Sequence, residues 1–207
     1  MVIVSDLLVL PTIRYKDEYS ESDLEDQADD IDYYWAAYID NRDGDYPLNV
    51  TTYWYHEVDL SDDDPSSVSE ARDASANYLE ENYSYLIDDY DAFVVYDERS
   101  NVMDSNGYAR IGSTSNQAAG SDDFEDCTAY VTEYGATGQH EVGHLYAGRH
   151  ERCRMYLDRD YHTVMASYSN TEEDCPGRDF EWQSSRSREF YHCVINDVQD
   201  YYDHWNL

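Results

Sequence analysis

One short segment combines residue types that could bind a metal ion and move a proton. Its chemistry-bearing residues are His140, Glu141, His144 and His150. Histidines four positions apart on an α-helix lie about 40° apart around the axis, so both imidazoles can face one metal ion. The carboxylate of Glu141 projects from the adjacent side, where it could accept a proton from a water molecule that the metal activates. We expect one Zn²⁺ ion, with the three histidines as ligands and Glu141 as general base.

The third histidine requires the helix to end before it is reached. His150 lies six residues beyond His144, and in a continuous helix its side chain would point away from the other two. Gly148 lies between them and can adopt a positive φ angle, which ends a helix and turns the chain. Three protein ligands would leave the open coordination position that catalysis needs.

These residues resemble the active-site signature of the metzincin clan of zinc endopeptidases, HExxHxxGxxH followed by a turn that contains a methionine. The three histidines and the glutamate keep the spacing of the clan, but Ala147 stands at the position of its glycine and Gly148 follows one residue later. By this resemblance Met165, in the sequence TVMASY, is the methionine of the turn beneath the metal. By the same resemblance, Tyr168 is a candidate for a residue that stabilises the transition state.

A looser resemblance covers nearly the whole chain and concerns the adamalysin (reprolysin) branch. In that branch a disulfide joins the region before the active-site helix to the C-terminal helix, which implies Cys127–Cys193 and leaves Cys153–Cys175. Four cysteines allow three pairings, and the sequence does not choose among them. Two disulfides would place the protein outside the cytoplasm, as a secreted or extracytoplasmic protein, whereas four buried free thiols are the alternative.

The elements that must position the site alternate between strands and helices. Apolar runs and period-two patterns predict strands, and capping boxes followed by apolar residues at steps of three and four predict helices. The expected strands are Val2–Leu10, Leu48–Leu60, Phe93–Tyr96, Gly107–Ser113 and Cys127–Val131. The expected helices begin at the capping boxes Ser22/Glu25 and Ser67/Glu70, and a final helix spans Ser185–His204.

This order favours a mixed α/β (α+β) fold, in which helices pack on a twisted, metzincin-like sheet with parallel neighbours. The length of 207 residues fits one catalytic domain. We expect an N-terminal lobe over residues 1–150, with the sheet and the active-site helix. Residues 151–207 would form a small irregular C-terminal lobe with the methionine turn and the terminal helix.

The charge of the chain limits its partners. Forty-six acidic residues face 13 basic ones, Lys16 is the only lysine, and the formal net charge is −33. Such a surface repels nucleic acids and anionic membranes, and no apolar run approaches the roughly 20 residues of a membrane span. The composition resembles that of proteins from extreme halophiles, and we prefer a solvated acidic surface over specific calcium binding.

We therefore expect a zinc-dependent endopeptidase that acts as a monomer on proteins or peptides. By resemblance, an extended substrate would lie antiparallel to an edge strand, for which Gly107–Ser113 is the candidate. Two alternatives stay open: a binding or surface protein that keeps zinc for structure, and a zinc hydrolase of a non-protein amide.

Overall fold

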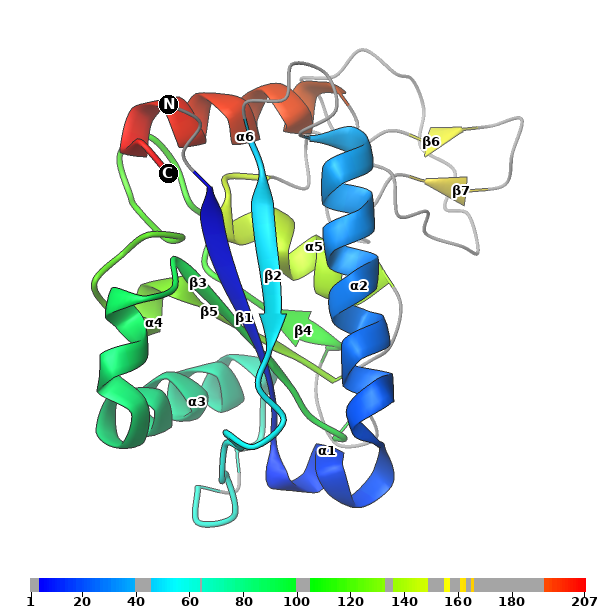
Figure 1. The fold of residues 1–207 in the computed structure, drawn as a ribbon, viewed down its shortest axis with the longest axis vertical. Helices are drawn as coiled ribbons and strands as arrows, with labels where there is room; N and C mark the ends of the chain where they lie inside the picture. Colours follow the sequence, from blue (N-terminus) through cyan, green and yellow to red (C-terminus); the bar gives the residue numbers. More distant parts are fainter. Residues whose placement is uncertain are drawn as a thin grey trace.

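The computed structural model describes residues 4–39, 46–63, 65–99, 105–132, 136–148, 155–156, 161–162, 165 and 192–207. Within them a five-stranded, mostly parallel sheet has the order β2-β1-β3-β5-β4, and only β4 runs antiparallel to its neighbour, at one edge (Figure 1). The five strands are β1 (Ser5–Pro11), β2 (Leu48–Thr52), β3 (Ala92–Tyr96), β4 (Gly107–Tyr108) and β5 (Thr128–Val131). A separate antiparallel pair joins β6 (Met155–Tyr156) to β7 (Tyr161–His162).

Helices cover both faces of this sheet. They are α1 (Ile13–Glu18), α2 (Glu21–Tyr38), α3 (Val68–Tyr83), α4 (Phe124–Cys127), α5 (Ala136–Leu145) and α6 (His192–Trp205), with a 3₁₀ helix, η2, over Ser84–Asp88. Side chains alternate along each strand, so Ala92 and Val94 of β3 join one core with α2, α5 and α6. Phe93 and Val95 join a second core with α3 and α4 on the opposite face. The predicted mixed α/β fold is confirmed.

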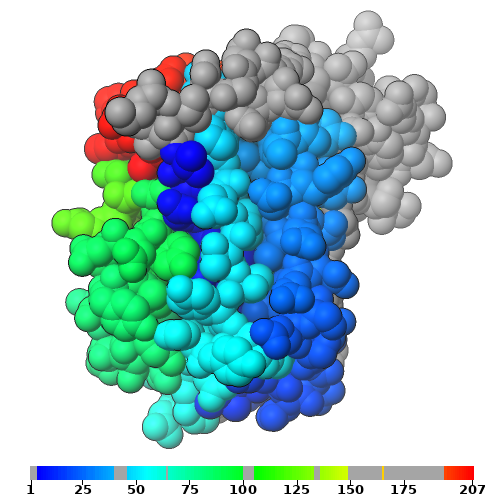
Figure 2. Space-filling view, viewed as in Figure 1, coloured from blue at the N-terminus to red at the C-terminus, as the bar shows by residue number. Residues whose placement is uncertain are grey.

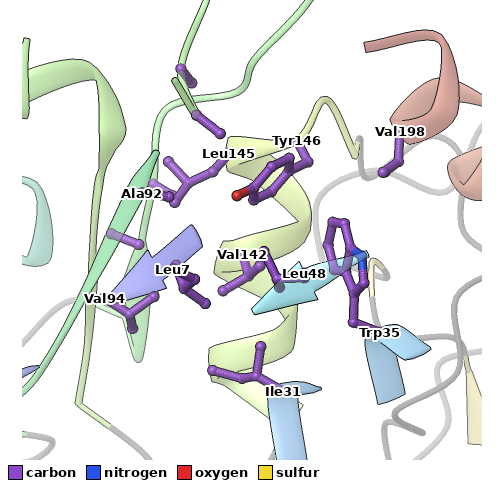
Figure 3. Packing of buried hydrophobic residues seen from close by; sticks show 14 of the residues in the cluster. Leu7, Ile31, Trp35, Leu48, Ala92, Val94, Val142, Leu145, Tyr146 and Val198 are labelled. Atoms are coloured by element: carbon purple, nitrogen blue, oxygen red, sulfur yellow. The ribbon is translucent and has the colours of Figure 1, made fainter. Parts of the chain in front are cut away.

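Aromatic side chains join α2, α5 and α6 within the first core. The ring of Trp35 lies edge-on to that of Tyr146, with 4.9 Å between centroids, and Tyr146 stacks on Tyr202 at 5.3 Å. Figure 3 shows Tyr146 next to the end of α5, with Trp35 from α2 and Val198 from α6 around it. The last helix of the chain therefore packs into the same core as the sheet and α5.

Several predicted boundaries differ from the structure. The strand expected over Gly107–Ser113 ends at Tyr108, and the strand expected from Cys127 begins at Thr128, because Cys127 ends α4. Helix α2 begins two residues earlier than expected, because Ser20 rather than Ser22 is the N-cap and exchanges hydrogen bonds with Asp23. The strand expected over Leu48–Leu60 ends at Thr52, after which the chain leaves β1 and returns only for a single bridge between Val58 and Thr12. Proline at the end of β1 has no N–H to continue a regular ladder with its neighbour.

The second capping box is confirmed. Ser67 is the N-cap of α3, and its hydroxyl accepts a hydrogen bond from the N–H of Glu70.

The face of the molecule in Figure 2 shows α2, in blue, beside β2 and the segment that follows it, in cyan. The exposed positions of α2 include Glu21, Glu25, Asp26, Asp29 and Asp32. The outer side of this helix is therefore a solvated acidic surface.

Among the helices that the structure describes, none combines the length and the apolar character that crossing a bilayer requires.

Candidate metal centre

Helix α5 carries the HExxH residues and packs against the sheet through its opposite side. Val142, Leu145 and Tyr146 are fully buried in the first core, at the spacing of one helical face (Figure 3). Gly138 continues that face, and any Cβ atom there would collide with the hydroxyl of Tyr96. The helix can approach the sheet closely because its first turn has no side chain at this point.

His140 and His144 lie on the side of α5 turned away from this core and bring their ring nitrogens together. Their Nε2 atoms are 3.1 Å apart, and the ring planes meet at 85°. Two imidazole nitrogens on a tetrahedral Zn²⁺, each about 2.0–2.1 Å from the metal, are separated by roughly 3.3 Å. The observed pair is therefore close to the arrangement that one zinc ion requires, and both side chains are buried.

The second ring nitrogen of His144 is held by the end of the helix. Its Nδ1 lies 2.7 Å from the carbonyl oxygen of Gly148. A carbonyl oxygen only accepts hydrogen bonds, so Nδ1 carries the proton and the Nε2 of a neutral ring presents its lone pair. Metal-binding histidines in proteins are commonly oriented in this way. The same lone pair can accept a hydrogen bond from Nε2 of His140, which accounts for the short distance without a metal.

Glu141 is buried, and its side chain lies against the edge strand of the sheet. Strand β4 passes over it so closely that a Cβ atom at Gly107 would lie 2.7 Å from Oε1 and 2.9 Å from Cγ of Glu141. The carboxylate therefore occupies the space between α5 and the edge strand. No feature of the sequence around Gly107 indicated this contact, since it joins residues 34 positions apart.

The end of α5 differs from the prediction in one residue. The left-handed conformation is adopted by Ala147, with φ 72°, and not by Gly148. The N–H of Gly148 donates to the oxygen of Gly143 (2.6 Å) and that of Ala147 to His144 (3.1 Å), which is a Schellman ending. Glycine is required at 148 for space, because a Cβ there would lie 2.7 Å from the Gly143 oxygen.

The last carbonyl groups of α5 receive hydrogen bonds from the segment that follows β4. The N–H of Gly112 donates to the oxygen of His144 (2.9 Å) and that of Ala119 to Leu145 (3.2 Å). Helix α6 supports this segment, because the hydroxyl of Tyr201 accepts from the N–H of Ala118 (2.7 Å) and donates to the oxygen of Ala119 (2.9 Å). Burial raises the pKa of this phenol, which keeps it protonated as a donor.

Of the other predicted site residues, Met165 is among those that the structure describes. Its side chain is fully buried in the first core, and its Cε lies 3.2 Å from the position that a Cβ at Gly148 would take. Met165 thus lies against the end of α5, next to the residue that holds His144. The predicted third ligand His150 and the predicted Tyr168 lie outside the described residues.

The predicted disulfide Cys127–Cys193 is not formed, because Cys127 is a buried free thiol. Cys127 belongs to the core between the sheet and α3, whereas the buried side chains of α6 belong to the core on the other face. The sheet therefore separates the two elements. The side chain of Cys193 and the predicted pair Cys153–Cys175 lie outside the part of the chain that the structure describes.

No protein-family model matches this chain, and no curated protein is significantly similar to it. Within the described ranges, no three His, Cys, Asp or Glu side chains form a group able to hold a metal ion. These findings overturn the assignment to the metzincin clan, and with it the adamalysin-like layout. The resemblance depended on His150 and on the methionine turn, whereas the described residues supply two histidines and a glutamate.

Proposed function

We propose that the protein is a zinc-dependent endopeptidase, with His140 and His144 as two of the zinc ligands. The observation that carries the proposal is the 3.1 Å separation of their Nε2 atoms, with His144 fixed through its Nδ1 by the carbonyl group of Gly148. Two histidines one turn apart on a helix bind the metal in many zinc peptidases, and the glutamate that follows the first of them acts as the general base. His150 is the proposed third ligand, on the spacing of the sequence alone.

Glu141 would be the general base. A bound zinc ion would supply Lewis-acid activation of a water molecule and of the substrate carbonyl group. The carboxylate of Glu141 would accept one proton from the attacking water while the oxygen of that water bonds to the carbonyl carbon, and would pass this proton to the amide nitrogen as the C–N bond breaks, so that one water yields a carboxylic acid and a free amine. Low exposure of Glu141 supports this role, since little bulk water competes for its oxygens.

A peptide substrate fits the architecture next to Glu141. Strand β4 is the edge of the sheet and pairs on one side only within the described residues, with β5. An extended peptide can add to such an edge through main-chain hydrogen bonds. Because Gly107 of β4 lies directly over Glu141, a peptide bound along this edge would run past the carboxylate. This arrangement favours a polypeptide over a small amide as the substrate.

The test combines metal analysis with a digestion. The purified protein, kept in molar salt, is assayed for bound zinc and for cleavage of casein and of an internally quenched peptide library, with and without a chelator. We expect one zinc per chain and cleavage at internal bonds that the chelator abolishes and zinc restores. Zinc without cleavage would identify a structural site, and cleavage of small amides alone would identify the other alternative; either outcome overturns the endopeptidase.

The third ligand is tested separately. His150→Ala should lose zinc and activity together, whereas His56→Ala, a histidine whose ring packs between Tyr53 and Tyr83 at 4.9 Å from each, should keep both. Full zinc occupancy in His150→Ala would remove this residue from the site and would require another ligand.

A further inference from the structure

We propose that Gly107 is a positioning residue for Glu141: the absence of a side chain at 107 lets β4 pass against the carboxylate and fix its orientation. The catalytic consequence rests on the proposed function, whereas the contact itself does not. A Cβ at 107 would lie 2.7 Å from Oε1, 2.9 Å from Cγ and 3.0 Å from Cδ of Glu141. Since carbon atoms in contact stay more than 3 Å apart, any side chain at 107 must displace either the strand or the carboxylate.

The strand is the less movable of the two. Gly107 and Tyr108 pair with Val131 and Tyr130 of β5, and the N–H of Thr132 donates to the oxygen of Asn106 across 2.8 Å. A second attachment lies on the opposite side of β4, where the guanidinium group of a buried arginine, Arg72, lies 5.5 Å from the ring centre of Tyr108.

Arg72 is itself fixed in place. It forms an ion pair with Asp73 at 2.5 Å and donates to the main-chain oxygen of Glu125, so that α3 and α4 both hold it. Strand β4 is thus attached to β5 along its length and to α3 through Tyr108. A side chain at 107 would therefore push the Glu141 carboxylate out of its place.

Displacement of this carboxylate should affect turnover more than binding. Proton transfer depends on the distance between the base and the attacking water, and a misplacement of about 1 Å can lower the rate roughly 10²-fold. Zinc binding and the pairing of a peptide with β4 use other groups. Gly107→Ala should therefore lower kcat and leave KM and zinc content unchanged.

The contact is tested first without any assay of activity. Thermal unfolding of the zinc-free protein is measured for wild type, Gly107→Ala, Glu141→Ala and the double variant. We expect Gly107→Ala to lower Tm by about 2 to 4 °C in the wild type, and to have little or no effect in the Glu141→Ala background, where the colliding atoms are gone. Equal shifts in both backgrounds would overturn the proposed contact.

The catalytic role is tested in the zinc-loaded protein. Gly107→Ala should lower kcat roughly 10²-fold at unchanged KM and unchanged zinc content, while Tyr55→Ala, which removes an 83% exposed side chain outside the proposed site, should keep wild-type kcat. Wild-type kcat in Gly107→Ala would overturn the positioning role. If the wild type has no peptidase activity, the proposed function fails, and the unfolding comparison still decides the contact.

Discussion

The carbonyl oxygen of Gly148 accepts a hydrogen bond from Nδ1 of His144 across 2.7 Å, while the N–H of the same glycine donates to Gly143 across 2.6 Å. One residue therefore ends α5 and orients a ligand of the candidate metal centre. Any change that moves Gly148 should alter the helix end and the imidazole together.

Gly148→Ala tests this link. The added Cβ would lie 2.7 Å from the Gly143 oxygen and 3.2 Å from Cε of Met165, so we expect a loss of about 1–3 kcal/mol in the free energy of unfolding. Zinc affinity should fall about 10- to 100-fold, because the partner of His144 Nδ1 moves. Denaturant unfolding and competition with a chelator measure the two effects. The neighbouring control Ala147→Gly keeps the carbonyl group of Gly148 and should keep the affinity; a Gly148→Ala protein with normal affinity would contradict the link.

Glu141→Gln separates catalysis from metal binding. Glutamine keeps the size of the side chain but cannot accept the proton, and general base assistance is worth roughly 10² to 10⁴ in rate. We expect peptide turnover to fall by at least that range while zinc content, measured by atomic spectroscopy, stays at the wild-type level. His140→Ala serves as the comparison and should lose metal and activity together. Near-normal cleavage by Glu141→Gln at full zinc occupancy would exclude this residue as the base.

Tyr201→Phe should weaken the support of α5 from a distance. The substitution removes the acceptor of the Ala118 N–H in a buried position, which costs about 1–3 kcal/mol in unfolding free energy. Hydrogen exchange at the amide of Gly112, which donates to His144, should also become faster. Tyr33→Phe, on a side chain that is 65% exposed, is the control and should change neither quantity. Unchanged stability in Tyr201→Phe would show that α6 does not brace this segment.

Cys127 should behave as an inert thiol in the native protein. It is fully buried, and burial raises the pKa of its thiol well above the usual range, so little thiolate forms at pH 8. We expect no alkylation by iodoacetamide until the protein is unfolded. Non-reducing peptide mapping then shows whether a disulfide joins Cys153 to Cys175. The predicted extracytoplasmic location now depends on that disulfide. A recovered Cys127–Cys193 peptide would contradict the structure.

Stability should depend on salt. The formal charge of −33 is screened over roughly 10 Å at 0.1 M salt and 3 Å at 1 M salt, so repulsion between carboxylates grows steeply on dilution. We expect circular dichroism to report unfolding as the salt concentration is lowered toward about 50 mM.

On α2, partial desolvation and the charge of Asp29 raise the pKa of Asp32. Asp29→Asn should therefore lower the salt requirement; a salt-independent wild type would remove the halophilic interpretation.

The order of strands and helices could be predicted from the sequence because it depends on local patterns. The buried run Phe93–Tyr96 and the capping box at Ser67 lie where the structure has β3 and the start of α3. The predicted ends of strands were wrong where a residue distant in the sequence determines them. Leu48–Leu60 alternates like a strand throughout, but regular pairing stops after Thr52, and Pro11 of the neighbouring strand has no N–H with which to continue it.

The candidate site was predictable to the same extent. The histidine pair and Glu141 follow from helix geometry alone, and the structure brings the two Nε2 atoms together as that geometry requires. The contact of Gly107 with Glu141 depends on how β4 crosses α5, which no local pattern encodes. Ala147 adopts the left-handed backbone conformation, which alanine disfavours. The glycine of this helix end stands one position later, at 148, where a Cβ atom would collide with the carbonyl oxygen of Gly143.

The bracing of α5 by the segment 112–119 and by Tyr201 also bears on how the protein is made. The amide groups that complete the end of α5 come from residues before it, but Tyr201, which holds their segment, is translated more than 50 residues after His144. During synthesis, a ribosome-bound chain that stops short of α6 lacks this support and the stacking of Tyr202 on Tyr146. The end of α5 is therefore braced from this side only after α6 has been translated.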